Sequence, residues 1–177
     1  MCFKSMKNTG LELCFYNKDM ISEIEYLLHP KFKHLSDVHK SDYLRVYFMH
    51  NFGGGYGDIK FYKNSWLSAL YKLDKSNKYI LGYTEVREDA VALVGGYLEI
   101  ELKKNYLSLI GNGAYICKQG TEFTKEWLDR TNKVLDDKEF DKEYPLKWTE
   151  LLGNVFHPLC LEFKDFILHD NSVKPVF

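Results

Sequence analysis

The chain has 177 residues, of which 45% are hydrophobic and 28% charged. This composition excludes a disordered chain and predicts a single globular domain, residues 1–177, with a substantial core. The 24 basic and 25 acidic residues give a net charge of −1, so a polybasic face is not expected, and nucleic acids and anionic membranes are poor candidates as partners.

The first part of the chain predicts a short strand and two helices. Residues 11–16, LELCFY, have the composition of a strand, and Asn17 can cap a helix that runs to Leu28. We expect an apolar stripe of that helix to pack in the core. Its members are Met20, Ile21, Ile24, Leu27 and Leu28. A second helix is predicted to begin near Ser36 and to end at the glycines 53–55.

Residues 56–62 alternate and predict a strand after the glycines. One face would carry Tyr56, Asp58, Lys60 and Tyr62, while the face with Ile59 and Phe61 would point into the core.

The rest of the chain continues to alternate between helices and strands. In order, the pattern predicts a helix from Asn64 or Ser65, strands over 79–86 and 109–118, a helix over 121–135, a polar linker over 136–143, a short helix that ends by Pro158, and a strand over 163–170. Residues 87–104 have no clean period. This alternation predicts an α/β layered domain with a mostly parallel sheet, in which ligands bind beyond the carboxyl ends of strands.

The stretch from Lys40 to Lys63 gathers polar side chains at the junction of a helix and a strand. Asp42 and Arg45 are three apart and therefore neighbours on a helix, and Asp58 and Lys60 follow the glycines. Each of these residues also has a plainer interpretation. Asp42 and Arg45 could form a surface ion pair worth about 0.3–0.5 kcal/mol, Asp58 could be a turn residue, and Lys60 could be a solvated lysine at a sheet edge.

Residues 41–60, SDYLRVYFMHNFGGGYGDIK, resemble the pattern S-D-x-x-R-x-x-x-L-x-x-x-G-G-x-Y-x-D-x-D. That pattern marks glycosyltransferases of the sugar-binding DXD type, which include relatives of yeast mannosyltransferases, capsular polysaccharide enzymes and the glucosylating clostridial toxins. The resemblance implies a single GT-A-like, Rossmann-like domain. The strand I-P-K-x-I-H-x-x-W that usually opens this domain is missing from the sequence.

The resemblance also implies roles for individual residues. Ser41 and Asp42 would bind the donor sugar, and Arg45 would contact the sugar and the diphosphate. Tyr56 and Asp58 would hold the ribose and sugar, with Asp58 as a ligand of Mn²⁺ or Mg²⁺. Lys60 stands where the family has its second acid, and its ammonium could neutralise the diphosphate instead.

Two later segments resemble the family with lower specificity. They are NGAYICKQGTEFTKEW and ELLGNVFHP, which suggest Asn112 as a sugar contact and His157 as a contact of a donor phosphate or metal. The alternatives are that Asn112 satisfies a turn and that His157 is a structural histidine.

The function that the resemblance implies is transfer of a sugar from a UDP- or GDP-sugar to a glycan or other acceptor, as in polysaccharide biosynthesis. One alternative is a non-catalytic sugar-nucleotide or carbohydrate-binding remnant of such an enzyme. Another is an α/β interaction protein in which the polar cluster is only an ion-pair network.

The cysteine spacing and the length of the apolar runs predict where in the cell the protein is found. Cys2, Cys14, Cys117 and Cys160 have no metal-binding spacing, which favours free thiols in a reducing cytoplasm. Because the sequence has neither an apolar run of about 18 residues nor an apolar stretch near Met1, we expect no membrane span and no signal peptide.

Overall fold

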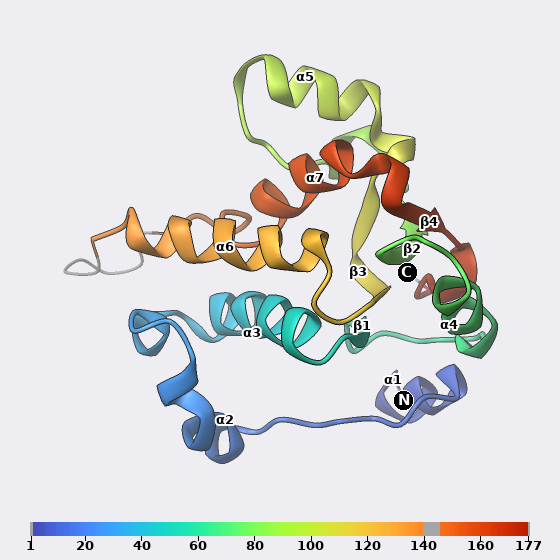
Figure 1. The fold of residues 1–177 in the computed structure, drawn as a ribbon, viewed down its shortest axis with the longest axis horizontal. Coiled ribbons are helices and arrows are strands. Elements are labelled where there is room, and N and C mark those ends of the chain that lie inside the picture. The colour runs from blue at the N-terminus through green and yellow to red at the C-terminus, as the bar shows by residue number, and fades with distance from the viewer. Residues whose placement is uncertain (1, 140–145, 177) are drawn as a thin grey trace.

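The computed structural model describes residues 2–139 and 146–176 and contains one open, mixed sheet of four strands (Figure 1). The strands are β1 (Gly54–Gly57), β2 (Ile80–Thr84), β3 (Ile110–Cys117) and β4 (Ile167–His169), in the order β1-β3-β2-β4. The predicted α/β class is therefore confirmed.

The strand directions differ from the prediction of a mostly parallel sheet. β3 is antiparallel to both β1 and β2, and only β2 and β4 are parallel. The physical reason lies in the connection between β2 and β3. Glu85 donates its N–H to the carbonyl of Leu109 (3.0 Å), so the chain returns beside the end of β2 from which it left. Helix–strand alternation in sequence does not reveal such a return.

Some of the helices cover both faces of the sheet. The helices of the described residues are α1 (Cys2–Met6), α2 (Lys18–Ile24), α3 (Asp37–Asn51), α4 (Leu67–Asp74), α5 (Gly96–Lys104), α6 (Glu122–Asp136) and α7 (Gly153–Glu162). Helices α3, α6 and α7 pack on one face through a cluster that includes Trp127 and Phe156, and α4 packs on the other through Leu73. No helix in the described ranges is long and apolar enough to cross a membrane.

The central strand β3 is apolar on both faces because it lies between these two layers. Tyr115 and Cys117 belong to the core cluster under α3, α6 and α7, whereas Ala114 and Ile116 belong to the cluster under α4. All four side chains are buried. A strand covered on both sides loses the simple alternation of polar and apolar residues.

Three of the predicted helix starts are confirmed, whereas the helix predicted from Asn64 or Ser65 begins at Leu67, after Trp66, without a capping side chain. Asn17, Ser36 and Thr121 each accept a hydrogen bond from the backbone N–H three residues later. These bonds satisfy amides that lack a partner within the first helical turn. The strands predicted over 79–86 and 109–118 are confirmed in β2 and β3.

The N-terminal predictions were wrong in part. Residues 11–16 are extended but do not join the sheet, and α2 ends at Ile24 rather than Leu28. No residue of α2 itself is buried, and Met20 is 42% exposed, so this helix does not pack its apolar stripe into the main core. Figure 1 shows the reason: α2 lies beyond α3, away from the sheet.

Two other element boundaries differ from the sequence prediction. β1 ends at Gly57, and the chain bends at residues 58–60, where Lys60 donates its N–H to the carbonyl of Asp58 (2.7 Å). Ile59 and Phe61, which were predicted to point into the core, are consequently 65% and 39% exposed. α7 continues through Pro158, since its buried face extends to Leu159 and Cys160. The polar linker predicted over 136–143 lies partly outside the described residues.

Candidate functional site

Asp42, Arg45 and Tyr56 form a compact group where α3 meets β1. The turn of the helix places Asp42 Oδ1 3.0 Å from Arg45 Nη2, and both side chains are buried. The glycines after α3 reverse the chain so that β1 returns along the helix. The Arg45 guanidinium therefore lies over the Tyr56 ring, 4.2 Å from its centroid, in a cation–π contact.

Tyr56 connects this pair to Asp58. Its hydroxyl donates to Asp58 Oδ1 at 2.8 Å, and Lys60 Nζ lies 3.3 Å from Asp58 Oδ2. The predicted neighbourhood of Tyr56, Asp58 and Lys60 is therefore present. It arises from a turn and not from one strand face as the sequence suggested.

The turn at Asp58 is fixed by its backbone. Asp58 donates its N–H to the carbonyl of Gly113 (2.8 Å), and its own carbonyl accepts from the Tyr62 hydroxyl (3.0 Å). Tyr62 is almost fully buried, so the turn is anchored to the core on the α4 side of the sheet. This anchoring holds the Asp58 carboxylate in position beside Tyr56.

Burial raises the pKa values of two side chains in this group, Asp42 and Tyr56. It raises the pKa of Asp42, an effect that the adjacent Arg45 guanidinium opposes. Burial also raises the pKa of the Tyr56 hydroxyl well above its usual range, with a smaller contribution from Asp58. Tyr56 therefore keeps its proton at neutral pH and remains the hydrogen-bond donor to Asp58.

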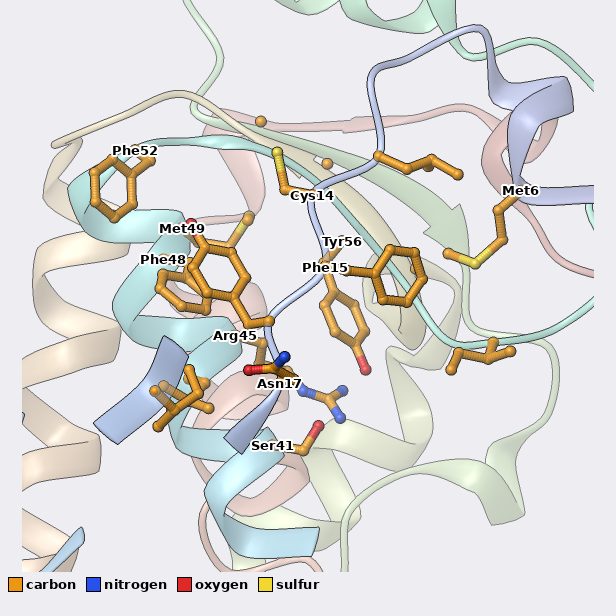
Figure 2. Close-up of a pocket in the computed structure, with 18 of the residues that line it drawn as sticks. Met6, Cys14, Phe15, Asn17, Ser41, Arg45, Phe48, Met49, Phe52 and Tyr56 are labelled. Carbon is orange, nitrogen blue, oxygen red and sulfur yellow. The ribbon is translucent and has the colours of Figure 1, made fainter. Parts of the chain in front are cut away.

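A cavity of about 800 Å³ opens beside this group, between residues 11–18 and the paired α3 and β1 (Figure 2). Ser41, Arg45 and Tyr56 line it, together with many aromatic side chains. Tyr16 stacks on Phe48 at its rim, with ring centroids 4.4 Å apart. Sequence reasoning missed the contribution of residues 11–18, because an extended segment outside the sheet has no periodic signature.

The Arg45 guanidinium has one N–H that is left without a hydrogen-bond partner in the described part of the chain. Nη2 faces Asp42, and Nη1 donates to the carbonyl of Asn112 (3.3 Å). Nε is buried and has no hydrogen-bond partner in the described part of the chain. A buried unpaired donor is costly, so this N–H is a candidate contact for an anionic ligand.

Asn112 lies at the site, whereas His157 lies behind it. His157 has no exposed surface, and its Nδ1 accepts a hydrogen bond from the N–H of Ala92 (3.0 Å). Its Nε2 is 3.3 Å from Asn112 Nδ2 and 3.6 Å from Glu85 Oε2. The predicted contact of His157 with a phosphate or metal is therefore not available in this structure. Glu85 is a buried carboxylate that sequence reasoning did not single out.

Burial lowers the pKa of His157 to about 4, so the ring is neutral at pH 7 and does not form an ion pair with Glu85. The unfolded chain binds this proton near pH 6.5, and the folded chain does so only near pH 4, so stability falls as the pH drops through this window. We expect His157 to account for a loss of about 2 kcal/mol in the free energy of unfolding between pH 7 and pH 5. Urea unfolding of the wild type at both values measures the loss.

His157→Gln is the matched control for this pH dependence, because its amide can still accept from Ala92 but does not titrate. The comparison is needed because burial raises the pKa values of Asp42 and Glu85, and these two carboxyls make the folded chain more stable as the pH falls. An equal pH dependence in the wild type and the variant would contradict the assignment.

The residues around Asp58 do not match the ligand set of a Mn²⁺ or Mg²⁺ site. Both carboxylate oxygens are engaged, one by the Tyr56 hydroxyl and one by the Lys60 ammonium. No group of three or more histidine, cysteine or acidic side chains that could hold a metal ion occurs within residues 2–139 and 146–176. We therefore assign no metal-dependent step to this site.

Comparison with known proteins gives no match to a family model, to a curated protein or to a solved structure. The arguments for function therefore rest on the residues and geometry described above.

Proposed function

We propose that this protein is a glycosyltransferase that takes a sugar from a nucleoside diphosphate sugar, with an α/β domain of GT-A-like type. The observation that carries the proposal is the placement of Arg45. Its guanidinium is held between Asp42 and the Tyr56 ring at the wall of the cavity, and Tyr56 connects it to Asp58 and Lys60. Two cations beside two carboxylates suit a ligand with a diphosphate at one end and hydroxyls at the other.

The cavity supports a ligand of this size. Small-molecule sites usually measure about 300–1,000 Å³, are mainly apolar and carry a few fixed polar groups. The 800 Å³ cavity has aromatic walls, with Phe15, Phe48 and Phe52 among them, which offer stacking surfaces for a base. The polar group of Ser41, Arg45 and Tyr56 lies together on its α3–β1 wall.

The proposed chemistry depends on position and charge. Arg45 and Lys60 would stabilise the departing diphosphate, while Asp42 and Asp58 would accept hydrogen bonds from sugar hydroxyls. The acceptor would be a glycan or another hydroxyl compound. We assign no general base, because the two carboxylates of the group are already engaged by cations.

A second candidate function is binding of a sugar nucleotide without transfer. The extended segment 11–16, which stays outside the sheet, favours it, because all six of its residues line the cavity. A wall without sheet hydrogen bonds is less rigid than a strand, and transfer needs a more closely fixed geometry than binding does.

Calorimetric titration with a panel of UDP- and GDP-sugars tests the proposal and separates the two candidates. We expect one sugar nucleotide to bind and, with no acceptor added, to be hydrolysed slowly as water takes the sugar. Binding without turnover would support the second candidate. Absence of binding across the panel, with a folded protein, would contradict both.

A further inference from the structure

We propose that Lys60 supplies, as a fixed positive charge, what a divalent cation would supply at this position, so that the site binds nucleoside diphosphates without a metal. The inference rests on the proposed function and deepens it. It starts from the mismatch between a DXD-type sequence, which implies a metal, and the groups that surround Asp58.

Both oxygens of the Asp58 carboxylate already have a partner. The Lys60 ammonium lies 3.3 Å from Oδ2, and the Tyr56 hydroxyl donates to Oδ1 at 2.8 Å. A divalent cation that bound Asp58 would have to displace the Lys60 ammonium from the carboxylate, and the two positive charges would then lie side by side. Repulsion between the two positive charges would oppose such binding.

The charged side chains of the group balance one another without a metal ion. Asp42, Arg45, Asp58 and Lys60 have formal charges that cancel. An acid at position 60 would leave the same group with two excess negative charges, which is the charge that one divalent cation balances. Lysine at position 60 therefore removes the electrostatic need for the ion.

Lys60 and Asp58 are accessible to a ligand at the edge of the cavity, which their neighbours Tyr56 and Ile59 line. The Lys60 side chain is 37% exposed and that of Asp58 is 30% exposed, in contrast to the buried Asp42 and Arg45. An ammonium carries three donors, so Lys60 can hold Asp58 and still donate to a phosphate oxygen. The anchored turn at 58–60 keeps its backbone fixed while the side chain adjusts.

Calorimetry with UDP and GDP, in buffer with EDTA and then with MnCl₂, tests the inference. We expect the wild type to bind one of them with an affinity that differs by less than about twofold between the buffers. Lys60→Ala should weaken binding by about tenfold or more in both buffers, because one charge-assisted contact is lost. Binding only with Mn²⁺ would overturn the inference and leave the proposed function in place, whereas no binding in either buffer would overturn both.

Titration with MnCl₂ alone provides a measurement that does not depend on the nucleotide. Lys60→Asp creates the acid pair, and we expect this variant to bind Mn²⁺ at least tenfold more tightly than the wild type. Lys63→Asp is the matched control, since it makes the same charge change at an exposed position three residues away. Mn²⁺ binding by the wild type that is lost in Asp58→Ala would overturn the inference, as would equal binding by the two Lys→Asp variants.

Discussion

Replacement of Asp58 by alanine is expected to abolish sugar transfer and donor hydrolysis, with a loss of at least about a hundredfold in rate. The carboxylate accepts from the Tyr56 hydroxyl and pairs with Lys60, so its removal takes a partner from both groups at once. The loss should appear in the donor-hydrolysis rate with the sugar nucleotide that binds in the calorimetric panel.

The melting temperature of Asp58→Ala should change little, because the side chain is 30% exposed and the turn is held by backbone hydrogen bonds. Asp74→Ala is a matched control, since Asp74 is an exposed carboxylate that also pairs with a lysine. Full activity in Asp58→Ala would remove Asp58 from the site.

The largest effect on stability is expected for Arg45→Met. This change removes the cation that pairs with Asp42 and leaves a carboxylate that is only 4% exposed without its partner. Removing one partner of a buried ion pair costs about 3–5 kcal/mol. We expect a loss of this size in the free energy of unfolding, measured with urea.

The double variant Arg45→Met with Asp42→Leu tests the cause of that loss. Neither charge remains buried in it, so most of the lost stability should return, although donor binding should not. Lys125→Met is a control at an exposed ion pair within one helix, Lys125 with Asp129 four residues on, and it should leave unfolding nearly unchanged. Failure of the double variant to recover stability would show that the pair is not the main source of the effect.

The parts of the fold that sequence reasoning predicted depend on local chemistry. The caps at Ser36 and Thr121 and the apolar strand that became β3 follow from neighbouring residues, and each lies where the pattern placed it. The direction of β3 does not follow from local chemistry, because the chain returns beside β2 only after a long connection through α5, which packs on α7.

The candidate site was predictable to a similar extent. Helical spacing predicted the Asp42–Arg45 pair, and the glycines predicted the reversal that brings Tyr56 back to it. The tight turn at 58–60 was not predictable, because alternation of side chains favoured a longer strand. The buried position of His157 likewise depends on packing around α7, which a lone histidine in a sequence does not reveal.

The central claim is that the group around Arg45 and Tyr56 binds a nucleoside diphosphate sugar. A crystal structure with the tightest-binding sugar nucleotide tests this most directly. The claim predicts phosphate oxygens within hydrogen-bonding distance of Arg45 and Lys60, the sugar beside Asp42 and Asp58, and the base among the aromatic side chains of the cavity. A nucleotide bound elsewhere on the protein, with Arg45 and Asp58 untouched, would contradict it.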